Sequence, residues 1–195
     1  RKLPPLPGIL HVGMDFNVGN MCLCIAHVDE SGMVNIHDEI HMQSSNTEEV
    51  CQEIKNRYPG AKIMVYPDPS CKARKSSAGG KTDLSILQNA GFVVRVRNNH
   101  TPVRDRINAV NAKLKNAQDQ IGLTVDYKAK HVINSLERLV YKEGTNVVDK
   151  DTGYDHMADA VGYLIDFLFP ITVNFENTST GVFKFRGGRY HGERW

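Results

Sequence analysis

The sequence predicts an α/β fold with a mixed central sheet and helices on both of its faces. Residues 9–42 contain three apolar runs separated by turn-forming residues, which is typical of consecutive antiparallel strands. Residues 43–169 alternate short apolar runs with segments of helical periodicity, which is typical of strands joined by helices. With 195 residues, of which 41% are hydrophobic, the chain is long enough for one sizeable core.

The first helix after the three strands is predicted over residues 45–58. A polar cap and an acidic first turn favour its start, and the Pro-Gly pair at 59–60 ends it. The apolar run 62–66 follows and is typical of a buried strand, and the Pro-Asp-Pro sequence at 67–69 terminates it. This strand is therefore expected to lie in the centre of the sheet, with Asp68 at its carboxyl end.

A β-α-β unit is predicted next, because the helix 82–87 separates the strand 62–66 from a strand at 92–96. Such a unit favours parallel pairing with a right-handed crossover. Beyond it, apolar periodicity predicts a helix at 103–117, a weak strand at 123–125, and helices at 131–141 and 154–169.

Asp15 interrupts an otherwise apolar strand between two glycines, Gly13 and Gly19. Burying a carboxylate costs on the order of several kcal/mol unless a cation or hydrogen-bond donors satisfy it. Asp15 is therefore a candidate metal ligand. The alternative is that it points outward from an edge strand.

Asp68 is held between Pro67 and Pro69 at the end of the central strand. The prolines fix the chain direction, so the carboxylate has a defined position at the sheet edge where ligands gather. An Asx turn or a helix cap is the alternative role.

The last helix begins with a second group of candidates, Asp155, His156 and Asp159. Asp159 can share a helix face with either of the other two. We expect Asp159 to be a metal ligand. Asp155 has two possible roles, either as a metal ligand or as an acidic residue that interacts favourably with the helix dipole. His156 has three possible roles: it could bind Mn²⁺, orient a water molecule or only pack against its neighbours.

Carboxylates that converge from separate elements suit Mg²⁺ or Mn²⁺, which prefer oxygen ligands. Two such ions about 3.5–4 Å apart can activate a water and stabilise the leaving oxygen in phosphodiester hydrolysis. Basic residues are also concentrated in one segment. Residues 72–106 contain eight basic and two acidic residues, a net charge of +6, which leaves −4 for the rest of the chain. This distribution indicates a polyanion-binding surface, with solvated loop charges as the alternative.

Three segments resemble, in the same order, the acidic motifs of terminase large-subunit nuclease domains of tailed phages. They are Gly13-Met14-Asp15-Phe16, Val65-Tyr66-Pro67-Asp68-Pro69 and Asp155-His156-Met157-Ala158-Asp159-Ala160. The third segment is the most specific, and the resemblance covers roughly residues 8–170.

The resemblance implies a ribonuclease H-like fold and a metal-dependent endonuclease that cuts concatemeric double-stranded viral DNA during genome packaging. It implies Mg²⁺ or Mn²⁺, as two ions, held by Asp15, Asp68 and Asp159, with assistance from His156. Asp155 is retained as a further candidate ligand. Basic residues after the second motif and in the helix at 103–117 are then expected to contact double-stranded DNA: Lys72, Arg74, Lys75, Lys81, Arg104 and Arg106.

The resemblance also implies an organisation and a set of partners. Residues 1–8 are expected to be the remnant of a linker to the ATPase motor domain of the same full-length chain, and residues 9–170 the nuclease domain. Residues 171–195 form a basic-aromatic tail, for which docking to the portal protein is a hypothesis. The small terminase subunit is the other expected partner, and the host cell cytoplasm during viral assembly is the expected location.

Several other classes are disfavoured by the sequence. No run approaches the roughly 18 apolar residues of a membrane span, and the first residues lack the apolar core of a signal peptide, so a membrane or secreted protein is not expected. The four cysteines form no CxxC pair and indicate no zinc site.

Two alternatives are open. One is another ribonuclease H-like enzyme such as a junction resolvase, and an integrase-like enzyme is disfavoured because its usual third acidic residue, a glutamate, is not found here. The other is a non-enzymatic DNA-binding or portal-binding module, which would show neither cleavage nor thermal stabilisation with Mn²⁺.

Overall fold

The computed structural model of the chain describes residues 8–17, 19–73 and 81–171. Its elements follow one another as β1 (Ile9–Asp15), β2 (Asn20–Val28), β3 (Val34–Gln43), α1 (Thr47–Arg57), β4 (Lys62–Pro67), the 3₁₀ turn η1 (Pro69–Lys72), α2 (Asp83–Asn89), β5 (Val93–Val94), α3 (Val103–Leu114), β6 (Leu123–Val125), α4 (Lys130–Arg138) and α5 (Asp155–Leu168). The predicted DNA contacts Arg74 and Lys75 lie outside these residues. So do the predicted linker remnant and the predicted tail, except for residues 8 and 171.

One mixed sheet of six strands, in the order β5-β4-β1-β2-β3-β6, forms the centre of the structure. Strands β1, β2 and β3 make an antiparallel meander, whereas β4 pairs parallel to β1, β5 parallel to β4, and β6 parallel to β3. The predicted mixed sheet, the meander and the parallel β4–β5 pair are therefore confirmed.

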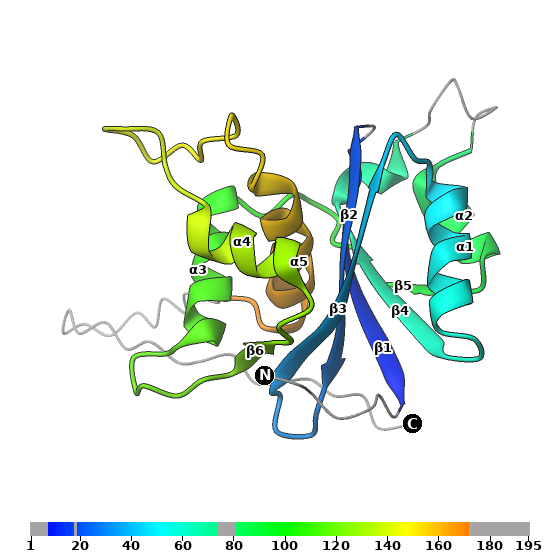
Figure 1. Ribbon diagram of the computed structural model, residues 1–195, viewed down its shortest axis with the longest axis horizontal. Coiled ribbons are helices and arrows are strands. Elements are labelled where there is room, and N and C mark those ends of the chain that lie inside the picture. Colours follow the sequence, from blue (N-terminus) through cyan, green and yellow to red (C-terminus); the bar gives the residue numbers. More distant parts are fainter. Residues whose placement is uncertain (1–7, 18, 74–80, 172–195) are drawn as a thin grey trace, which may run out of the picture.

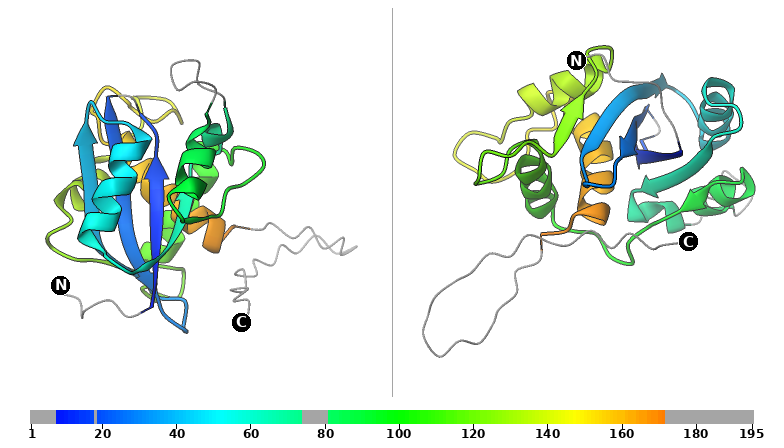
Figure 2. Two further views of the ribbon diagram at one scale, coloured as in Figure 1. Left: turned by 90° about the vertical axis from the view of Figure 1, so that its right-hand side faces the viewer. Right: turned by 90° about the horizontal axis from the view of Figure 1, so that it is seen from below.

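Helices cover both faces of this sheet, as predicted. Helices α1 and α2 lie on one face, and α3, α4 and α5 lie on the other (Figure 1). Seen from below, the orange helix α5 lies directly against the sheet, with α3 and α4 outside it (Figure 2). Each face has its own apolar core, so the strands of the middle of the sheet are buried on both sides.

Strand β1 shows how the two faces differ. Leu10, Val12 and Met14 point into the core under α1 and α2. The residues that alternate with them point toward α5, because successive side chains of a strand lie on opposite faces. Among these is Gly13, where an added Cβ would lie 2.1 Å from the backbone oxygen of Ala160 in α5. The absence of a side chain at Gly13 thus allows α5 to cross β1 in direct contact.

Three predicted elements end two or three residues earlier in the structure than in the sequence prediction. Strand β5 contains only two residues, and α3 ends at Leu114 because Lys115 adopts an extended backbone. Helix α4 ends at Arg138, and the chain then forms an antiparallel bridge between Tyr141 and Val148. No helix in the described part of the chain is long and apolar enough to cross a membrane.

Candidate metal centre

The contact between α5 and β1 brings Asp15 to the amino-terminal half of α5. Asp15 is the last residue of β1 and lies two residues beyond Gly13, on the same face of the strand. Its side chain is buried, with 6% of the residue exposed. Asp15 therefore faces α5 rather than solvent, which removes the outward-facing alternative.

The pKa of Asp15 is raised above its ordinary value, chiefly because burial disfavours the charged form. A hydrogen bond from His156 opposes this rise, whereas the nearby negative charges of Asp159 and Asp68 add to it. The carboxylate is thus desolvated and lies among other acidic groups, an environment that a cation would stabilise.

Asp68 follows β4 and lies beside the end of β1, where its backbone N–H donates to Met14 O at 3.1 Å. One carboxylate oxygen accepts a hydrogen bond from Ser70 N at 2.7 Å, as the cap of η1. The other accepts from the Tyr163 hydroxyl of α5, also at 2.7 Å. Asp68 therefore has the capping role considered from the sequence, and its side chain also contacts α5.

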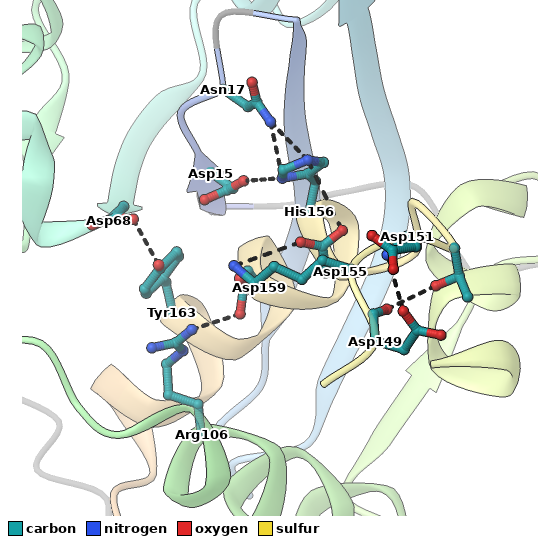
Figure 3. A network of polar contacts seen from close by, with 12 residues as sticks. Asp15, Asn17, Asp68, Arg106, Asp149, Asp151, Asp155, His156, Asp159 and Tyr163 are labelled. Carbon is teal, nitrogen blue, oxygen red and sulfur yellow. Dashed lines mark hydrogen bonds and ion pairs between the residues drawn. The ribbon is translucent and has the colours of Figure 1, made fainter. Parts of the chain in front are cut away.

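Asp159 lies one turn inside α5 and is paired with Arg106 of α3, whose Nη2 is 2.6 Å from Asp159 Oδ1. Figure 3 shows Asp15, Asp68 and Asp159 arranged around the amino-terminal half of α5, each with a different protein partner. The three carboxylates that the sequence selected thus come from three separate elements of the fold and gather on one side of the sheet.

His156 connects Asp15 to a further residue, Asn17. Its Nδ1 is 3.1 Å from Asp15 Oδ2, and its Nε2 is 2.7 Å from the side-chain nitrogen of Asn17. Because an amide nitrogen donates, these distances fit a ring that donates from Nδ1 and accepts at Nε2. The hydrogen bond to Asp15 raises the pKa of His156, against a lowering effect of burial.

Asp155 is the first residue of α5 and is only 4% exposed. Its Oδ2 lies 3.8 Å from Lys150 Nζ, whereas its Oδ1 is buried without a hydrogen-bond partner. Both roles weighed from the sequence fit its position. It stands at the positive end of the helix dipole, and its Oδ1 accepts no hydrogen bond, although His156 Nε2 lies 3.9 Å from it.

The donor set fits a hard divalent cation, because it consists of carboxylates, of which Asp15 and Asp155 are buried, with a neighbouring imidazole. Among the described residues, however, no three His, Cys, Asp or Glu side chains lie close enough together to hold one ion. Metal binding by three of these side chains therefore requires them to move closer together.

The predicted DNA contacts are placed unevenly. Lys72, Lys81 and Arg104 are exposed, and Lys72 lies on η1 immediately after Asp68. Arg106 instead is buried, 4% exposed, against Asp159. Its guanidinium is therefore part of the interior of the site and not of its surface.

The sequence analysis did not predict three residues that contact the carboxylates of the site or their partners. Two of them, Tyr163 and Asn17, were not named as candidates, and Arg106 was predicted to contact DNA instead. Tyr163 could have been found from its spacing, because it lies four residues after Asp159 on the same helix face. Asn17 has the weaker signal of standing two residues after Asp15. Nothing in the sequence indicates that Arg106 pairs with Asp159, because 53 residues separate them along the chain.

Solved structures with a similar fold include the large terminase of a thermophilic bacteriophage, at TM-score 0.63 and 17% identity over 85% of this chain. The nuclease domain of the P22 large terminase has a TM-score of 0.61 at 13% identity, covering 84% of this chain and 85% of that one. That of the phage SPP1 large terminase, solved with bound Mn, has a TM-score of 0.52 at 13% identity, covering 80% and 85%.

The chain therefore has the ribonuclease H-like α/β fold of terminase large-subunit nuclease domains. It spans 41% of the length of the large terminase from the thermophilic phage and most of the isolated nuclease domains. No protein-family model matches the sequence. The comparison with curated proteins gives no match.

Proposed function

We propose that this chain is the nuclease domain of a terminase large subunit, a metal-dependent endonuclease that cuts double-stranded viral DNA during genome packaging. The observation that carries the proposal is the buried Asp15 carboxylate, which lies among Asp68, Asp159 and His156. A buried acidic group with further acidic neighbours is unfavourable by itself and becomes favourable when a cation binds. The three sequence motifs and the shared fold support the same function.

Asp15, Asp68 and Asp159 are the residues proposed to hold Mg²⁺ or Mn²⁺, with Asp155 as a further ligand through Oδ1, which accepts no hydrogen bond. When bound, two such ions supply an activated water and stabilise the leaving oxygen of a phosphodiester. His156 restrains the Asp15 carboxylate by its hydrogen bond, and Asn17 restrains the ring of His156 in turn. This hydrogen-bonded chain keeps Asp15 oriented although it lies at the end of a strand.

DNA is proposed to approach along the basic residues that follow Asp68 and begin α3. Lys72, Lys81 and Arg104 are exposed there and can neutralise phosphates. Such contacts carry no base readout, which suits cutting with little sequence preference. The motif resemblance is the basis for three further proposed partners: an ATPase motor domain of the same full-length chain, the portal protein and the small terminase subunit.

Plasmid cleavage with Mg²⁺ or Mn²⁺ tests the proposed activity. The wild-type chain is compared with Asp15→Asn and Asp68→Asn, and with Asp151→Asn as a matched control. Asp151 lies four residues before α5, and its side chain is 85% exposed, so its loss removes one negative charge near the site but no proposed ligand. We expect wild type and Asp151→Asn to cut, and the other two variants to lose activity at unchanged folding.

Asp159→Asn needs a check of folding, because it leaves the buried Arg106 without its counter-charge. Breaking a buried pair in this way costs about 3–5 kcal/mol. Cutting by Asp15→Asn and Asp68→Asn at the wild-type rate would show that the site lies elsewhere. A preference for four-way junctions over linear duplex would favour the resolvase alternative.

A further inference from the structure

Two of the three proposed ligands are linked to each other by side chains that the sequence analysis did not assign to the metal centre. Arg106 of α3 contacts Asp159, and Tyr163 of α5 contacts Asp68. Arg106 and Tyr163 also contact each other, because the guanidinium carbon lies 4.6 Å from the centre of the tyrosine ring. A continuous path of contacts therefore runs from Asp159 to Asp68 (Figure 3).

The Arg106 side chain is fixed on several sides. Its Nη2 is 2.6 Å from Asp159 Oδ1, and its Nη1 donates to Thr101 O at 2.9 Å. Thr101 is itself tied to α5, since its hydroxyl donates to Asp166 Oδ2 at 2.8 Å. On the helix side, an added Cβ on Gly162 would lie 3.6 Å from Arg106, so α5 packs closely against this side chain. Arg106 consequently has little freedom to leave Asp159.

Tyr163 fixes Asp68 in a similar way. Its hydroxyl donates to Asp68 Oδ2 at 2.7 Å, while the backbone N–H of Ser70 holds Oδ1 at the same distance. The carboxylate of Asp68 is thus oriented at both oxygens, each of which has a further lone pair. In Asp159, Oδ2 has no contact comparable to that between Oδ1 and Arg106 among the described residues.

We propose that Arg106 and Tyr163 are positioning residues that anchor one carboxylate oxygen each of Asp159 and Asp68 and so orient both groups for the movement that brings them to a divalent cation. The proposal rests on the proposed function and assigns to Arg106 a role other than contact with DNA. Hydrogen-bonding partners that orient metal ligands commonly contribute roughly 10- to 100-fold to metal affinity. The positive charge of Arg106 opposes a cation, so the proposal requires that its effect on ligand orientation outweighs this repulsion.

The side-chain chemistry predicts that lysine cannot replace Arg106. The planar guanidinium contacts Asp159, Thr101 and the Tyr163 ring at the same time, whereas an ammonium group is a point charge without a flat face. Arg106→Lys therefore keeps the positive charge and loses the planar contacts. The variant separates the effect of charge on the cation from the effect of side-chain geometry on ligand orientation.

Calorimetric titration of the full chain with MnCl₂ tests the proposal. The variants are Arg106→Gln, Arg106→Lys and Tyr163→Phe, with Lys115→Gln as the control. Lys115 follows α3, and its side chain is 63% exposed and paired only with Asp119 among the described residues, so this substitution removes a charge near the same helix without touching the site. Circular dichroism and thermal melting report folding of each variant.

We expect Arg106→Gln and Arg106→Lys each to weaken Mn²⁺ binding roughly 10- to 100-fold, and Lys115→Gln to leave it unchanged. Tyr163→Phe loses one hydrogen bond and keeps the ring, so its affinity should fall less, with a melting temperature close to wild type. This variant decides the outcome if the Arg106 variants do not fold.

Unchanged affinity in folded Tyr163→Phe and Arg106 variants would assign these residues a purely structural role and overturn the proposal. Tighter Mn²⁺ binding in Arg106→Gln would overturn it too, because Arg106 would then act as a competitor of the metal. In both cases wild-type binding would leave the proposed nuclease function standing. Wild-type protein that binds no Mn²⁺ would instead overturn the proposed metal centre and this inference together.

Discussion

The two faces of the central sheet are built from the same strands but bury different chemistry. Under α1 and α2, the core is apolar apart from one buried polar pair, in which the Thr47 hydroxyl of α1 donates a hydrogen bond to the Asp83 carboxylate of α2. Under α3, α4 and α5, an apolar core is combined with buried charged groups, among them Asp15, Arg106 and Asp155. The first face therefore contributes mainly to stability, whereas the second holds carboxylates that are unfavourable without a cation.

Helices α1 and α5, which cover opposite faces of the sheet, differ at their amino termini. Helix α1 begins with a capping box in which Asn46 and Glu49 satisfy each other's backbone N–H groups. Helix α5 has no side-chain cap, and its first turn contains Asp155 and His156 instead. Helices α3 and α4 also lack a side-chain cap, but only α5 contributes its first turn to the site, where Asp155 also interacts favourably with the helix dipole.

Gly13→Ala should produce the largest effect, because it breaks the contact between β1 and α5. The new Cβ would meet backbone at 2.1 Å, which no side-chain rotation can relieve. We expect a loss of more than about 3 kcal/mol in the free energy of unfolding. Urea denaturation measures it, with Gly19→Ala as control, since a Cβ there meets nothing closer than 3.7 Å. Equal stability of the two variants would contradict the close crossing of α5 over β1.

Leu23→Ala tests the opposite face alone. Leu23 is fully buried under α1 and α2, and its truncation should cost about 3 kcal/mol. Mn²⁺ affinity of the folded variant, measured by calorimetry, should be that of wild type. A large fall in affinity would show that the two faces are coupled more strongly than their separate cores indicate.

Asp15→Asn should stabilise the protein in the absence of metal, by about 1 kcal/mol near neutral pH. Asparagine avoids the burial of a charge and can still accept a hydrogen bond from His156. The comparison requires thermal melting of both proteins in chelator, and a lower melting temperature for the variant would contradict the cost assigned to the buried carboxylate.

The pH dependence of this difference has a definite sign. The folded-state pKa of Asp15 is raised above 3.8 by burial, and that of His156 is raised above 6.5 by its hydrogen bond to Asp15. Each group therefore favours the folded state at low pH, and this contribution is lost as the pH rises through the folded pKa. Wild type should accordingly lose stability relative to Asp15→Asn from about pH 4 upward.

The smallest effect is expected on the outer surface of α1. Glu53→Gln removes an exposed ion pair with Arg57 four residues along the helix, which contributes about 0.2–0.5 kcal/mol. Urea denaturation at low and high salt should show this small loss disappear with screening. A loss larger than that of Leu23→Ala would contradict the view that the apolar core supplies the stability of this face.

Much of the fold and of the site was accessible from the sequence. Alternating apolar residues predicted β1, β2 and β3, and the cap and Pro-Gly pair placed α1 correctly. Asp15 and Asp68 were selected because they interrupt and terminate apolar strands, and Asp159 because it can share a helix face with Asp155 or His156. The structure brings the three carboxylates to one side of the sheet. Their role as metal ligands is still a prediction.

The errors lie where local pattern and tertiary contact disagree. Residues 139–141 continue the apolar periodicity of α4, but Tyr141 pairs with Val148 in a bridge that periodicity cannot reveal. Residues 95–96 have strand composition, yet β5 ends at Val94. Short elements at the edges depend on their neighbours more than on their own sequence.

By itself, the sequence determined which residues alternate, which helices are capped and where carboxylates stand at strand ends, because these properties depend on neighbours along the chain. Only the tertiary structure decided that Gly13 admits α5 to the sheet, that Tyr163 reaches Asp68, and that Arg106 is turned inward to Asp159. The physical reason is that these contacts join residues from 53 to 147 positions apart, where the free energy of packing and charge pairing outweighs any local preference.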